Sequence, residues 1–124
     1  MENFFIAGTR ETPEVSINVN EGTFSIKGRT LSEDSVAFFA PIFKQAEEYF
    51  KNPVPTTTFI LSFEYLNSSS LKLVIDLLVF SKKMLSANNA ILVKWNYEAD
   101  DDDILMLGEE SARLTGLPFE YHPY

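Results

Sequence analysis

The sequence contains no cysteine and a single histidine, and both shortages limit the kinds of functional site that the protein can have. Without cysteine there is no disulfide framework and no thiolate metal site, which is compatible with a reducing cytoplasm. No charged-then-apolar leader opens the chain, and no apolar run approaches the ~18 residues that suggest a membrane span. We therefore predict a cytoplasmic protein that is neither exported nor membrane-spanning.

Basic residues are also scarce. The 10 Lys and Arg against 18 Asp and Glu give a formal net charge of −8 at pH 7. An acidic surface repels phosphate backbones and anionic lipid, so we expect neither nucleic acid nor a membrane as a partner. Hydrophobic residues make up 45% of the 124-residue chain, enough for one domain with a substantial core over residues 1–124.

The stretch from Thr56 to Leu85 contains a predicted strand that runs directly into a predicted helix. Aromatic and β-branched residues alternate between Thr57 and Phe63, a mix typical of a strand covered on both faces. From residue 71 onward the apolar spacing becomes helical. Asn67 stands at the N-cap position, where its side-chain oxygen can accept a backbone N–H two or three residues later.

Three serines, Ser68, Ser69 and Ser70, then occupy the first turn of this helix. Unpaired N–H groups and the helix dipole attract anions to such an end, so an added phosphate fits there. Plain capping explains the same residues, because Ser and Asn are common at helix starts in every protein class. A further alternative is a small-ligand sensor that binds an anion or a nucleotide at this helix end.

The segment Tyr65-Leu66-Asn67-Ser68-Ser69-Ser70, placed between a strand and an apolar helix, resembles the signature of STAS domains of the anti-sigma-factor-antagonist type. In those domains a strand ends in Asp-Ser-Ser-Gly, and a regulatory kinase phosphorylates the first serine. Two positions differ here, since Asn67 replaces the Asp and Ser70 replaces the Gly. The resemblance implies that Ser68 is a phosphoserine site, surrounded by Asn67, Ser69 and Ser70.

Almost the whole chain resembles the SiaC-type regulatory phosphoproteins, which are bacterial STAS-like proteins. The segments that carry this likeness are residues 8–15, 22–28, 38–41 and 65–70. The resemblance implies signal transduction by partner switching, in which a cognate serine/threonine kinase and a PP2C-like phosphatase set the phosphorylation state of Ser68. That state would decide whether the protein binds its target, which in some systems is a diguanylate cyclase.

The rest of the chain alternates strands with helices. We expect a short strand at residues 4–6, a β-hairpin over residues 15–28 and a helix from near Ser32 to Phe50. Pro41 lies inside that helical pattern, so either the regular helix starts late or residues 38–41 form a bent entry. A strand at residues 90–97, a helix ending at Gly116 and a last strand at 119–121 follow. This order predicts a single α/β domain, with about three helices packed on a mixed sheet. The more specific description, STAS-like, comes from the resemblance.

The helix after the serines carries two apolar stripes. The first contains Leu71, Val74, Ile75, Leu78 and Leu85; the second contains Leu73, Leu77, Phe80 and Met84. Burial of both would make the helix interior. If the second stripe is instead exposed on the monomer, it is a protein-docking face beside Ser68, or a surface that becomes buried when two copies form a homodimer. The docking hypothesis gives a partner-binding set of Tyr65, Leu66, Lys72, Leu73, Leu77 and Phe80. Phosphate at its edge would add about two negative charges, which repel an acidic partner and attract an arginine-bearing one.

No group of residues points to catalysis. The acidic run at Glu98 and residues 100–103 lacks the alternation and the glycine of a calcium loop, so it favours a helix N-terminus instead. His122, close to the last residue of the sequence, is expected at the surface and has no nucleophile to activate. We therefore predict no catalytic residue, no metal site, no cofactor and no enzyme activity.

Overall fold

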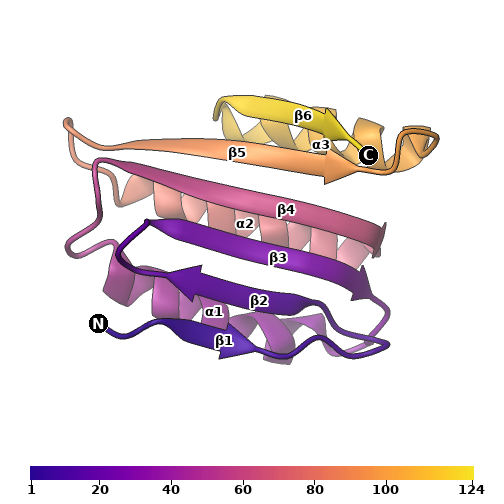
Figure 1. Cartoon of the computed structure of the whole chain (residues 1–124), viewed down its shortest axis with the longest axis horizontal. Helices are drawn as coiled ribbons and strands as arrows, with labels where there is room; N and C mark the ends of the chain where they lie inside the picture. Colours follow the sequence, from indigo (N-terminus) through magenta and orange to yellow (C-terminus); the bar gives the residue numbers. More distant parts are fainter.

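Six strands form one mixed sheet, and three helices cover a single face of it in the computed structural model, which describes all residues, Met1–Tyr124 (Figure 1). The strands are β1 (Phe4–Ile6), β2 (Glu14–Asn18), β3 (Thr23–Thr30), β4 (Thr56–Leu66), β5 (Ala90–Tyr97) and β6 (Phe119–Pro123). The helices are α1 (Ser35–Tyr49), α2 (Ser68–Lys83) and α3 (Asp102–Thr115). The predicted α/β class and the order of elements are confirmed.

The strands lie side by side in sequence order. The β1–β2 and β2–β3 pairs are antiparallel, and β3 to β6 are parallel. Each of α1, α2 and α3 connects one parallel strand to the next. Because every crossover advances in the same direction and crossovers share one hand, all three helices fall on the same face.

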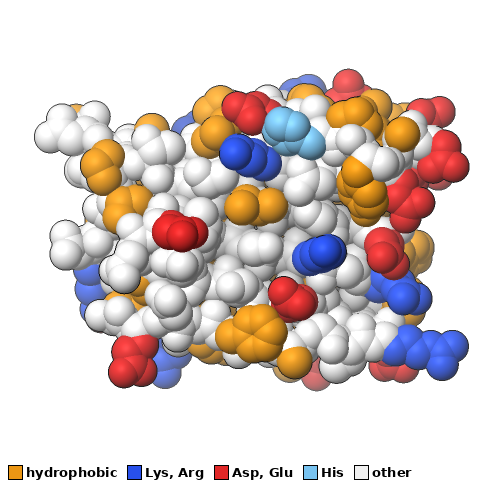
Figure 2. Space-filling view, viewed as in Figure 1, with side chains coloured by type: hydrophobic (Ala, Val, Ile, Leu, Met, Phe, Trp, Pro, Cys, Tyr) orange, Lys and Arg blue, Asp and Glu red, His pale blue; other side chains and the backbone are white.

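The opposite face of the sheet is open, and it faces the viewer in Figures 1 and 2. Along β4, Phe59 and Leu61 point to the helices and are buried, while Ile60 and Ser62 alternate onto the open face and are half-buried. The expectation that β4 is covered on both faces is therefore wrong. Its polar and β-branched residues on the open side are shielded only by the neighbouring strands.

The core lies between the sheet and the helices. Trp95 of β5 is fully buried there, and its indole N–H donates to the carbonyl of Ile104 at 3.0 Å. Gly108 of α3 lies directly against the indole, since a Cβ added at that position would lie 2.5 Å from Nε1. A glycine in the middle of α3 thus allows the helix to pack closely on β5.

The first helix begins later than residue 32, where the sequence pattern placed it. Asp34 is the N-cap, and its side chain accepts the N–H of Ala37 at 3.2 Å. The preceding loop cannot join the helix because the N–H groups of Leu31 and Ser32 both bond to the carbonyl of Glu11. Neither reading of Pro41 is observed, because α1 begins at Ser35, six residues before this proline, and continues through it to Tyr49.

None of the three helices combines the length and the apolar character required to cross a lipid bilayer.

Candidate functional site

The junction between β4 and α2 is held by Asn67. Its Oδ1 accepts the N–H of Ser70 at 2.9 Å, and its carbonyl accepts the N–H of Leu71 at 2.9 Å. Its own N–H donates to Oγ1 of Thr30 at the end of β3, also at 2.9 Å. The predicted cap is confirmed, and α2 begins at Ser68 as the spacing indicates.

The three serines of the first turn differ in what their hydroxyls contact. Ser70 is only 2% exposed, and its Oγ lies 2.9 Å from Oγ of Ser35. Ser69 is an exposed residue, but its Oγ lies 2.9 Å from the same Ser35 hydroxyl and donates to Oδ1 of Asn67 at 3.3 Å. Ser68 is exposed, and its hydroxyl forms no hydrogen bond within the protein. Of these three serines, only Ser68 offers a free hydroxyl to another molecule.

Ser35, in the first turn of α1, is part of this site although the sequence analysis did not identify it. Its side chain is 4% exposed and bridges the first turns of α1 and α2. No local sequence signal pairs it with Ser69, because 34 residues separate the two positions. Its place directly after a capping aspartate identifies it only as a first-turn residue.

The site lies at the edge of the sheet where β3, β4 and β5 end (Figure 1). Leu31 and Val36, from the loop after β3 and the start of α1, leave large apolar side chains exposed there, Val36 by 69%. The crevice between Ser35, Ser70 and Phe38 encloses about 10 Å³, room for about one water molecule. It is too small to enclose a nucleotide.

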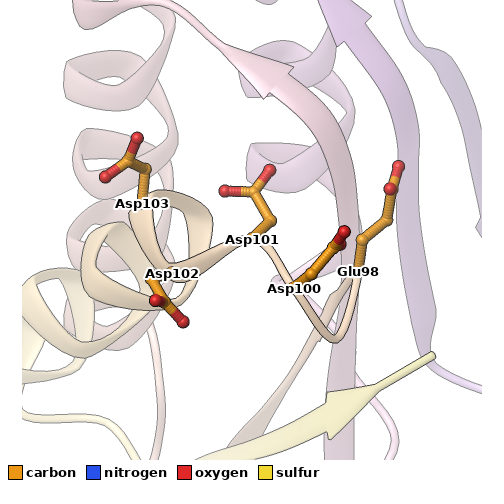
Figure 3. A pocket seen from close by; sticks show the side chains of 5 residues that line it. All are labelled: Glu98, Asp100, Asp101, Asp102 and Asp103. Atoms are coloured by element: carbon orange, nitrogen blue, oxygen red, sulfur yellow. The ribbon is translucent and has the colours of Figure 1, made fainter.

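The acidic run lies at the same edge, after β5. Figure 3 shows the side chains of Glu98 and of the four aspartates that follow pointing in different directions. No group of three or more carboxylate or imidazole side chains is arranged to hold a metal ion. Asp101 caps α3, with its Oδ1 accepting the N–H of Ile104 at 3.0 Å, so the predicted helix-start role is confirmed.

The pKa of Tyr124 reflects the negative charge that accumulates at this edge of the sheet. Burial raises the pKa of Tyr124, and the negative charges of Glu98, Glu64 and Asp101 raise it further. An anion added at this edge therefore enters an environment in which negative charge already accumulates, except at the helix N-terminus itself.

His122 is an exposed residue, as expected, and lies 3.0 Å from a carboxylate oxygen of Glu120.

The predicted partner-binding set divides into exposed and buried members. Tyr65 is exposed, and Lys72 is exposed with its Nζ 3.0 Å from Asp76. Leu73 and Phe80 are half-buried, the Phe80 ring packing at 5.9 Å from that of Phe43 on α1.

Two members of the set belong to the core. Leu66 is 6% exposed and Leu77 is 1% exposed, so the expectation that they face a partner is wrong. The reason is the position of α2, which packs against α1 on one side and α3 on the other. Both flanks of the helix are therefore covered, and the second apolar stripe is buried at Leu77 and half-buried at its other three positions, Leu73, Phe80 and Met84.

These features define a class of protein: a small mixed α/β domain that presents one free serine hydroxyl at a capped helix start, beside a crevice with room for about one water molecule. The model of the SiaC family regulatory phosphoproteins matches residues 6–124, so the chain belongs to this family. The family resemblance read from the sequence is thus confirmed.

Proteins similar to this chain in sequence and structure are found in Pseudomonas aeruginosa. An uncharacterized protein of strain UCBPP-PA14 is 24% identical over 119 residues, covering 96% of this chain and 94% of that protein. The crystal structure of apo-SiaC matches with a TM-score of 0.82 at 25% identity, over 98% of this chain and 99% of the other. SiaC in complex with the diguanylate cyclase SiaD, which it activates, matches with a TM-score of 0.88 at 23% identity, over 98% and 99% of the two chains.

Proposed function

We propose that this protein is a phosphorylation-controlled binding module of a bacterial partner switch, with Ser68 as the reversible phosphoacceptor. The single observation that carries the proposal is the difference among the three serines: Ser68 alone is exposed and free of hydrogen bonds. Membership of a family of regulatory phosphoproteins supports it independently.

The chemistry requires a serine/threonine kinase and a phosphatase as partners, because the chain supplies only the hydroxyl. Oγ of Ser68 attacks the γ-phosphorus of a nucleoside triphosphate bound to the kinase, and the bond from that phosphorus to the departing nucleoside diphosphate breaks. The hydroxyl proton passes to a base of the kinase. In the reverse direction a PP2C-like phosphatase directs water onto the phosphoserine, which regenerates the hydroxyl and releases inorganic phosphate.

The helix start tolerates the product. Phosphoserine adds about two negative charges at neutral pH, and the positive end of a helix dipole stabilises charge of that sign. The carboxylates of Glu98 and Asp101 lie at the same edge, so the phosphate would add to negative charge that a partner already meets there. Phosphorylation thus changes the electrostatics of the surface without requiring a change in the fold.

The proposed target is a signalling protein of the diguanylate cyclase type, as SiaD is for SiaC of Pseudomonas aeruginosa. The contact surface consists of Tyr65 and Lys72 beside Ser68, with Leu73 and Phe80 at its half-buried margin. Leu31 and Val36 extend it over the start of α1. Leu66 and Leu77 are left out because the core encloses them.

The test compares Ser68→Ala and Ser68→Asp with the unmodified protein for binding to purified diguanylate cyclases of the same organism. Asn88→Asp is the matched control, since it adds the same charge at an exposed position beyond the opposite end of α2. We expect Ser68→Asp to change the dissociation constant of one cyclase about tenfold or more, and Asn88→Asp to change it less than about twofold, because the added charge meets the partner only at Ser68. Phosphopeptide mass spectrometry of the protein from its own cells supplies the second readout. Unmodified Ser68 in those cells, together with unchanged affinity in both Ser68 variants, would falsify the proposal.

A further inference from the structure

Ser35 separates the three serines of α2 into one free hydroxyl and two that are engaged. We infer that Ser35 is a positioning residue that restricts phosphorylation to Ser68 by holding the hydroxyl of Ser69 against α1. The inference rests on the proposed function and concerns the choice between adjacent serines. Ser68 and Ser69 follow each other in one helical turn and are both exposed residues, so exposure alone does not decide between them.

The geometry around Ser35 favours this role. Its Oγ lies 2.9 Å from Oγ of Ser69 and 2.9 Å from Oγ of Ser70. A hydroxyl has one proton to donate and two lone pairs, so a single serine can bond to both neighbours at once. With its side chain 4% exposed, Ser35 has little water available as a substitute partner.

The contact is fixed by bonds on either side of it. The N–H of Asn67 donates to Thr30 at 2.9 Å, and Nδ2 of Asn67 donates to the carbonyl of Ser32 at 3.4 Å. Both acceptors precede α1 by only a few residues. The start of α1 is therefore tied to the cap of α2, which keeps Ser35 beside Ser69.

Transfer of phosphate to Ser69 would have to break these contacts. Its Oγ would leave Ser35 and Oδ1 of Asn67 before attacking the γ-phosphorus of the nucleoside triphosphate on the kinase. The same bonds then form and break as at Ser68, and the proton again passes to the kinase base. Ser68 enters this step without losing any hydrogen bond to the protein. One lost hydrogen bond corresponds to roughly a two- to tenfold change in rate, so Ser35 gives Ser68 an advantage of that order.

The test is phosphosite mapping of the full chain produced in the cells that encode it, so that the native kinase acts on it. Ser68, Ser69 and Ser70 lie in one tryptic peptide, residues 52–72, and fragment ions distinguish them. We expect phosphate on Ser68 in the wild-type protein, and a two- to tenfold larger share on Ser69 in Ser35→Ala. In a Ser68→Ala background, Ser69 should gain phosphate once Ser35 is also replaced by Ala.

Ser81→Ala is the matched control, because it removes a fully buried hydroxyl of α2 that bonds only to the carbonyl of Leu77, at 2.8 Å. A general loosening of the helices would raise the Ser69 share in both variants. Such a parallel rise, or an unchanged Ser69 share in Ser35→Ala, overturns the inference while leaving Ser68 as the acceptor. Absence of phosphate from Ser68 in the wild-type protein overturns this inference, and together with unchanged affinity in both Ser68 variants it overturns the proposed function as well.

Discussion

The side-chain oxygen of Asn67 lies 2.9 Å from the backbone nitrogen of Ser70, and this one bond orients the first turn of the helix that carries the candidate phosphosite. The bond is partly buried, so water replaces it poorly. It also links two parts of the site, because the same asparagine is anchored through its N–H to Thr30 on the neighbouring strand. The position of Ser68 therefore depends on the bonds made by Asn67, the residue directly before it.

Replacing Asn67 by Ala should lower the free energy of unfolding by about 1 kcal/mol, the usual effect of losing an N-cap side chain. Asn67→Asp keeps an oxygen acceptor at the cap and should retain most of that stability. Urea unfolding of both variants at neutral pH measures the difference. An Asn67→Ala protein as stable as the wild type would show that the cap contributes nothing here.

Acidic substitutions should distinguish Ser68 from Ser70 by stability alone. Ser68→Asp places a carboxylate in solvent at a helix N-terminus, where we expect a change of less than about 1 kcal/mol, in the stabilising direction. Ser70→Asp forces a charge into a position that is 2% exposed and holds no cation, and we expect a loss of about 3 kcal/mol or more. Thermal and urea unfolding report both values. Equal stability of the two variants would contradict the burial that separates these serines.

Leu77 and Tyr65 should behave in opposite ways, although both were predicted to contact a partner. Leu77→Ala removes a side chain from the core and should cost about 2–5 kcal/mol of stability. Tyr65→Ala changes an exposed position and should alter stability by about 0.5 kcal/mol or less, with its effect seen in partner binding. Unfolding curves and cyclase affinity measured on the same preparations separate the two. A binding defect in Leu77→Ala without a stability defect would place Leu77 at the surface after all.

Gly108→Ala should destabilise the protein by about 1–3 kcal/mol, because the new Cβ would lie 2.5 Å from the indole nitrogen of Trp95. The indole must shift, which weakens its hydrogen bond to the carbonyl of Ile104 and alters the fluorescence of the only tryptophan. Met106→Ala, at an exposed position of the same helix, is the control and should leave the emission unchanged. An unshifted emission spectrum in Gly108→Ala would show that α3 can move away without cost.

Local patterns predicted the parts of the site whose partners lie within one helical turn. Asn67 and Ser70 are three residues apart, so cap spacing alone placed the start of α2 and the serines in its first turn. The family resemblance selected Ser68 among them. The start of α1 was placed three residues early, because the bonds that hold Leu31 and Ser32 to Glu11 reach back along the chain by about twenty residues and leave no local signal.

Residues close in the chain specify the order of strands and helices and the location of the capped serine turn, since hydrophobic period and capping act over such short separations. Three other features arise only when the whole chain has folded: which serine hydroxyl is free, which face of the sheet is open and which side of α2 is buried. Each of those depends on an element brought alongside from a distant part of the chain: Ser35 from α1, the common side of the three crossovers, and the two helices that flank Leu77. Contacts of this kind arise from packing of whole elements, and no short stretch of sequence specifies them.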